Sequence, residues 1–245
     1  TLGVKELTYS RYRLGDFDLD LRAGMGANGD SGVGAGLKIN GEQALAAYAR
    51  MKNDSTGLHP DSIGLKLTRF PLSIANPFLG NMVAMGGRLN GSMRMDGSFT
   101  KPILNGELSF DTVTARIPMA GATLRFDKGP VTVANSVVHF DRFGIYGAND
   151  NPITLDGTVD ATKFSDIMVN LTMNARNTQL IKSDKRSKAD LYGKLFVNLD
   201  GSMKGSLNLL DIKANLNILG TTDVTYNLGA TPAELSGQGE TDVVR

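Results

Sequence analysis

The stretch LNGSMRMDGSFTKPILNGELSF, residues 89–110, decides the fold class of this chain. Apolar and polar side chains alternate along it, and glycines interrupt it at Gly91, Gly97 and Gly106. Alternation with a period of two is typical of a β-strand that buries one face. A chain made mainly of such segments is predicted to be all-β.

One face of this stretch carries Leu104, Leu108 and Phe110, and Gly106 falls on the same face. A glycine inside a strand often marks a bend or the close approach of another backbone. We expect the three large side chains to line an apolar surface, and Gly106 to leave room for curvature or for a ligand.

A five-residue pattern recurs: an aliphatic residue or methionine, Asn or Asp, glycine, a small or acidic residue, and an apolar residue. Its occurrences are LNGSM (89–93), MDGSF (95–99), LNGEL (104–108), LDGTV (155–159) and LDGSM (199–203). The intervals vary, and no fixed period of about 20 to 50 residues emerges. The pattern therefore indicates a reused strand unit rather than a strict repeat.

Alternating segments fill the chain from residue 87 to about residue 225, separated by turn signals. Their spacing of roughly eight to twelve residues predicts a large antiparallel sheet, sandwich or barrel. Residues 13–21 and 29–40 alternate in the same way and are also predicted strands.

Two segments indicate helix instead. Residues 42–52 lack alternation and are rich in helix formers, which predicts a short helix. Residues 71–82 predict a helical turn or two, with Pro77 in the first turn. We expect residues 1–245 to form a single elongated β domain, with possible parts at 1–86 and 87–245.

The composition excludes several classes of protein. The 26 Lys and Arg residues balance 25 Asp and Glu residues, so nucleic acid is not an expected partner. The absence of cysteine excludes disulfides, thiol catalysis and Cys-ligated metals. No run of about 18 apolar residues and no signal-peptide pattern occur. We expect a fragment of a longer, anchored protein whose targeting segment lies outside this chain.

Two motifs suggest ligand sites, but their context argues against both. GMGANG, residues 24–29, has the spacing of a dinucleotide-binding loop, yet a strand pattern follows it where a helix is required. DFDLD, residues 16–20, has the acidic residues of a calcium loop, but Leu21 stands where an EF-hand requires glycine. In a strand its aspartates would form a solvated face.

No catalytic arrangement is evident. His59 and His139 are far apart, and His139 alternates with Val137 as in an ordinary strand. The basic segment SDKRSKAD, residues 183–190, is interpreted as a solvated loop, with contact to anionic lipid head groups as an alternative. We expect a protein that is not an enzyme, with no catalytic residues, no cofactor and no metal site.

The alternation places aliphatic side chains on one face of the sheet. The candidate groove-lining residues are Leu104, Leu108, Phe110, Leu155, Val159, Val169, Leu171, Met173, Leu191, Leu195, Val197, Leu199, Ile212, Leu216 and Ile218. Such a face must be covered. The cover is either a second sheet or helix, as in a closed sandwich, or the sheet's own curvature, which would make a groove.

A groove of this kind would take an elongated apolar ligand, either an acyl chain or an amphipathic strand. With no Trp and ten Phe, its lining would be mostly aliphatic, which suits flexible lipid tails.

Residues 61–110 resemble the C-terminal domain of the TamB family. The shared features are a strand ending in Pro-Leu, a short helix with Pro-Phe-Leu, and spaced glycines between aliphatic residues. Residues 205–228 are similar to the corresponding part of Bacteroidetes members, and with residues 61–110 they extend the resemblance over most of the chain from residue 61 onward. Residues 229–245 depart from the family ending.

This resemblance implies an AsmA-like bridge protein with an inner-membrane anchor and a long periplasmic β structure, folded as a groove called a β-taco. The implied partners are phospholipid, a TamA-type outer-membrane barrel and client outer-membrane proteins. Two functions follow from it: carrying phospholipid acyl chains between the membranes, or acting as a scaffold for assembly of outer-membrane proteins. The residues alone leave both open, together with a closed sandwich of purely structural role.

Overall fold

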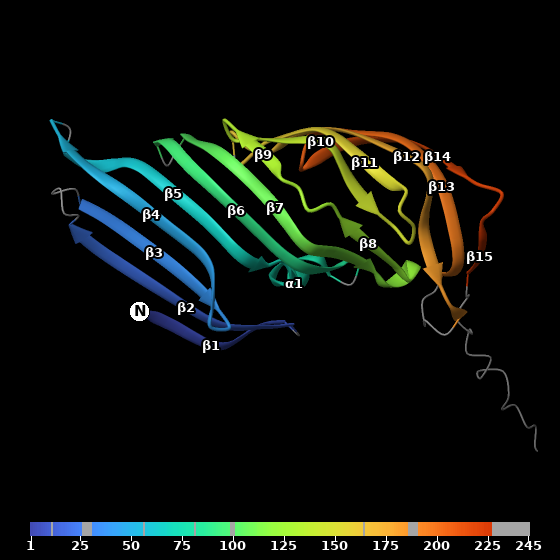
Figure 1. The fold of residues 1–245 in the computed structure, drawn as a ribbon, viewed down its shortest axis with the longest axis horizontal. Helices are drawn as coiled ribbons and strands as arrows, with labels where there is room; N and C mark the ends of the chain where they lie inside the picture. Colours follow the sequence, from blue (N-terminus) through green and yellow to red (C-terminus); the bar gives the residue numbers. More distant parts are fainter. Residues whose placement is uncertain are drawn as a thin grey trace, which may run out of the picture.

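The fold is known from a computed structural model, which describes residues 1–10, 12–25, 31–55, 57–80, 82–98, 101–163, 165–185 and 191–226. These residues form fifteen strands in one antiparallel sheet, which is elongated and curved along its length (Figure 1). The predicted all-β fold, a curved antiparallel sheet, is confirmed.

The sheet is built largely from neighbours in sequence. Its first part contains β1 (Leu2–Tyr9), β2 (Tyr12–Met25), β3 (Ser31–Ile39), β4 (Glu42–Asp54), β5 (Gly57–Pro71) and β6 (Ala84–Ser98). Its second part contains β7 (Lys101–Ile117), β8 (Ala122–Phe126), β9 (Val131–Ala134), β10 (Val137–Tyr146), β11 (Pro152–Asp160), β12 (Met168–Ser183), β13 (Leu191–Ser206), β14 (Leu209–Ile218) and β15 (Asp223–Tyr226). Strands pair in sequence order, except that β8 pairs with β7 and β10, β9 also pairs with β7 and β10, and β15 pairs with β13.

The predicted helix at residues 42–52 is wrong, because this segment forms β4. Helix propensity differs by only about 0.7 kcal/mol per residue among ordinary residues. In the sheet, β4 gains a backbone ladder to β3 on one side and to β5 on the other. These two ladders outweigh the local preference of its alanines.

The predicted helical turns near Pro77 are confirmed. A 3-10 turn, η1 (Leu72–Ala75), leads into α1 (Asn76–Leu79), with Pro77 in its first turn. The Asn76 side chain donates to the carbonyl oxygen of Met85 (3.0 Å) and accepts from its N–H (2.7 Å). These bonds fix the helical segment to the start of β6. A second 3-10 turn, η2 (Pro118–Ala120), connects β7 to β8.

Four bulges of one construction interrupt the ladders. At each, two residues of one strand lie opposite a single Asn or Asp of the neighbouring strand. The second of the two residues has a left-handed backbone conformation, and its N–H donates a hydrogen bond of 2.8 Å to that Asn or Asp side chain. The sets are Lys5–Glu6 opposite Asp16, Thr68–Arg69 opposite Asn90, Asp141–Arg142 opposite Asp156, and Arg176–Asn177 opposite Asn198. We call each hydrogen bond from a bulge N–H to the opposing Asn or Asp side chain a clasp. Bulges bend a strand and increase its twist, so the bulges with these clasps contribute to the curvature of the sheet.

Candidate functional site

One face of the sheet is apolar across nearly all its strands, and we call it the inner face. In the first part, cross-strand pairing places Leu19, Leu37, Leu45 and Leu67 in one row over β2 to β5. In the second part, a row over β11 to β14 consists of Gly157, Leu171, Met203 and Ile212. The inner face is formed by these rows and by the alternate residues of each strand that share their side.

On β1 to β6 the inner face is open to solvent, and we call this part the open segment. Leu2 is 68% exposed and Leu21 is 64% exposed, and Val4, Leu7 and Val33 are also exposed. The buried apolar residues of this part, Ile39 and Ala44, lie at the turn between β3 and β4. The remaining inner-face residues are mostly half-buried, so the open segment forms an apolar wall without a cover among the described residues.

On β7 to β13 the inner face is filled by the chain's own side chains, and we call this part the filled segment. Its buried residues are Val113, Ala115, Ala122, Val131, Val133, Phe143, Val169, Leu171, Ala175, Ile181 and Val197. The sheet curls so far here that β8 contacts β12 and η2 contacts β13, although other strands separate them in the sheet. The filled segment is therefore the hydrophobic core.

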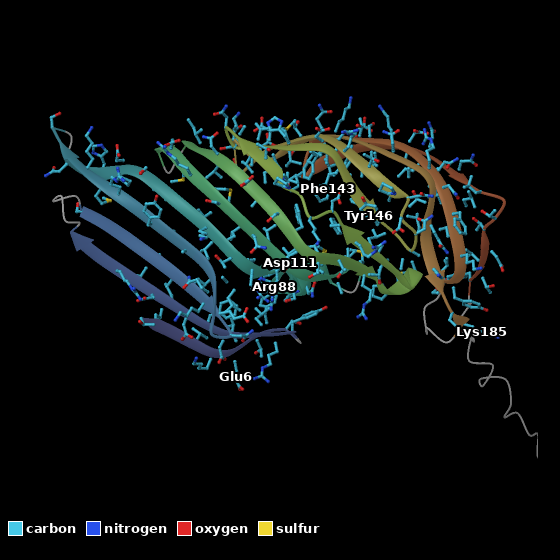
Figure 2. The ribbon with its side chains drawn as sticks, in the orientation of Figure 1. Glu6, Arg88, Asp111, Phe143, Tyr146 and Lys185 are labelled. Carbon is cyan, nitrogen blue, oxygen red and sulfur yellow. The ribbon has the colours of Figure 1, made fainter. Side chains whose placement is uncertain are left out.

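A cluster of phenylalanine rings lies where β7, at the start of the filled segment, meets β8 and β10. The ring centroid of Phe143 lies 5.2 Å from that of Phe110, 5.7 Å from Phe140 and 6.5 Å from Phe126. Figure 2 places Phe143 near the middle of the molecule's length, with Lys185 toward one end and Glu6 on the lower edge. We call these four residues the Phe cluster.

The predicted lining residues fall into three groups. Val169, Leu171 and Val197 are buried in the filled segment. Ile212, Leu216 and Ile218 of β14 are exposed. The half-buried ones are Leu104, Leu108, Phe110, Leu155, Val159, Met173, Leu191, Leu195 and Leu199.

The prediction missed the open segment. Its exposed apolar residues, such as Leu21 and Val33, lie in stretches whose alternation had already marked them as strands. That alternation could have added them to the lining. The Phe cluster had no sequence signal, because its members come together only through pairing of distant strands.

The helical segment forms a strap along one rim of the open segment. The ring of Phe78 in α1 stacks on Tyr9 at the end of β1, with centroids 5.3 Å apart. The Tyr12 hydroxyl of β2 donates to the carbonyl oxygen of Gly80 over 3.1 Å. Because β3, β4 and β5 lie between β2 and β6 in the sheet, this strap connects opposite sides of the open segment.

The outer face is polar, and the aspartates of DFDLD lie there. Lys5 Nζ lies 3.6 Å from Asp16 Oδ2 and 3.5 Å from Asp18 Oδ2, and Asp20 pairs with Arg22. The N–H of Glu6, donated to Asp16, and the nearby Lys5 hold the pKa of Asp16 below its usual value. The described residues contain no group of three or more His, Asp or Glu side chains placed to hold a metal ion.

The other sequence motifs have no site geometry in the described part of the chain. The segment after GMGANG is strand β3, and residues 26–29 of the motif lie outside the described residues. His139 is exposed on the outer face of β10, and His59 Nδ1 lies 3.1 Å from the carbonyl oxygen of Gly57. Residues 186–190 of SDKRSKAD and the departing segment 229–245 also lie outside the described residues.

The sheet and its inner face define an elongated all-β protein with an apolar trough. Residues 141–245 match the family model of the TamB C-terminal domain, and this match supports assigning this part of the chain to that domain. The match supports a role in outer-membrane biogenesis. No curated protein and no solved structure matches the chain. Within the described ranges, no helix is long and apolar enough to cross a membrane.

Proposed function

We propose that this chain carries the acyl chains of phospholipids along its apolar trough, between the inner and outer membranes. It would act in the periplasm, within a longer protein anchored in the inner membrane. The observation that carries the proposal is the open segment, whose apolar residues are exposed or half-buried and form continuous rows over β2 to β5. Burying a methylene group contributes about 0.8 kcal/mol, so an acyl tail lying on this wall would gain binding free energy from each methylene group that it buries.

The backbone of the trough favours a lipid tail over a protein strand as its occupant. A bound strand needs partners for its own N–H and C=O groups. Within β2 to β5 the backbone groups are used in ladders to both neighbours, so the inner face offers mainly side chains. An acyl tail has no hydrogen-bonding groups and needs no such partners.

A second candidate function rests on the edge strand β14. Apart from Leu210, all residues of β14 are exposed, and Ile212, Leu216 and Ile218 extend the apolar face to this edge. Such an edge could accept an amphipathic strand by β-augmentation. The occupant would be a TamA-type barrel or a client outer-membrane protein, which corresponds to the assembly-scaffold function.

Two alanines of β4 allow a matched test of the lipid proposal. Ala47 lies on the inner face opposite Ala35 and Leu65, whereas its neighbour Ala46 lies on the outer face; both are half-buried. The proposal expects Ala47→Asp to lose most of the phospholipid that co-purifies with the chain, measured by mass spectrometry, and Ala46→Asp to retain it. Equal lipid content in two folded variants would contradict it.

A further inference from the structure

The open and filled segments differ in whether a ligand has room on the inner face. Val197 and Thr178 have 0% exposure, and Leu171 and Phe143 have 7% and 6%. Protein interiors are packed as densely as organic crystals, so a tail could enter the filled segment only by displacing such residues. In the open segment, a tail would displace only water.

The length of the open segment suits one tail. Six adjacent strands at about 4.8 Å spacing extend over about 24 Å in the direction perpendicular to the strands. A bilayer core is about 30 Å thick, so a tail within one leaflet spans about 15 Å. A whole tail therefore fits on the open segment.

The Phe cluster lies at the end of this route. Phe110 on β7 is the first of the four rings met from β6, and it is half-buried. Behind it Phe143 is buried against Phe126 and Phe140. Four rigid rings contributed by three strands form a barrier that a flexible tail cannot pass without separating them.

We propose that an acyl tail occupies the open segment and stops at the Phe cluster, so that the filled segment is not part of the lipid path. The inference rests on the proposed function and makes it more specific: lipid passing along the molecule leaves the trough at the boundary between β6 and β7. Phe110 then sets the depth to which a tail enters.

The test uses the whole chain with vesicles of phosphatidylethanolamine and phosphatidylglycerol, doped with a phospholipid whose tail ends in a diazirine. After illumination, mass spectrometry maps the residues that carry lipid adducts. The expected adducts lie on the inner face of β1 to β6 and on Phe110. Adducts on Leu171 or Val197 would overturn the inference while supporting lipid carriage. An absence of adducts everywhere would overturn the proposed function, and the inference with it.

Phe110→Ala tests the barrier itself, with Phe78→Ala on the exposed strap as the control. In Phe110→Ala we expect the adducts on residues of β9 and β10 to rise at least several-fold, while the control keeps the wild-type distribution. Circular dichroism establishes that both variants fold. A folded Phe110→Ala protein with unchanged adduct positions would show that the Phe cluster does not limit the path.

Discussion

The side-chain oxygen of Asn90 on β6 accepts a hydrogen bond from the backbone N–H of Arg69 on β5, over 2.8 Å. Arg69 has a left-handed backbone (φ 51°) and is the extra residue of a bulge. Without Asn90 its N–H would lack this partner, because the bulge removes it from the ladder. The Asn of the recurring five-residue pattern is therefore a structural acceptor.

Replacing Asn90 by Ala should lower the free energy of unfolding by about 0.5–1.5 kcal/mol, the usual net contribution of one hydrogen bond. Asn90→Asp should cost less, because Asp156 makes the same bond to Arg142 in the equivalent bulge. Urea denaturation measures both variants. An Asn90→Ala protein as stable as wild type would show that solvent replaces the clasp without loss.

The clasp at Asp16 should depend on pH. The hydrogen bond from Glu6 N–H lowers the pKa of Asp16 in the folded state below 3.8, so its stabilising effect is complete above that value and is lost as the pH falls through the lowered pKa. Asp16→Asn keeps an acceptor oxygen and should remove this dependence. Amide hydrogen exchange at Glu6, compared between the two proteins from about pH 5 to about pH 3, tests it. Parallel loss of protection in both would contradict the assignment.

A side chain at Gly157 should be poorly tolerated. Gly157 has φ +122°, and a Cβ there would lie 2.2 Å from the carbonyl oxygen of Asn170. Gly157→Ala should therefore lose at least about 1–3 kcal/mol from backbone strain alone. At Gly34 a Cβ would meet only the Ala47 carbonyl oxygen, at 3.9 Å, so Gly34→Ala should be neutral or slightly stabilising. Thermal unfolding distinguishes the pair, and equal melting temperatures would be inconsistent with this view.

Two leucines of the inner face should respond differently to truncation. Leu171 is 7% exposed in the filled segment, whereas Leu216 of β14 is 55% exposed. Leu171→Ala should destabilise by about 2–5 kcal/mol, because it leaves a cavity in packed surroundings. Leu216→Ala should change stability by less than about 1 kcal/mol. Chemical denaturation of both tests whether the inner face is filled on β12 and open on β14, and similar losses would argue against that division.

The sequence predicted which residues share a face of the sheet better than it predicted which of those residues are buried. Period-two alternation placed Leu155, Val169 and Leu199 on one side, and cross-strand pairing confirms that they share the inner face. It could not separate buried from exposed members of that face. The difference between Leu171 and Leu216 depends on how far the sheet curls, which is a property of non-adjacent strands.

Local patterns also failed where an irregularity or a ladder overrode them. Residues 2–9 were not among the predicted strands, and the bulge at Lys5–Glu6 shifts their alternation in the middle of β1. The alanine-rich segment 42–52 favours helix only weakly, and pairing on both sides decides it. The Asn and Asp positions of the recurring pattern were visible, but their role required knowledge of the opposite strand.

The Asn and Asp clasps separate the shape of the sheet from the chemistry of its inner face. Each clasp involves only two adjacent strands, and its acceptor side chain opposes the bulge rather than an apolar row. During evolution, a strand pair could be bent or straightened by gaining or losing one clasp Asn or Asp, while the apolar rows of the inner face continue unchanged. A protein assembled in this way can adjust its span and bend independently of the residues on its inner face.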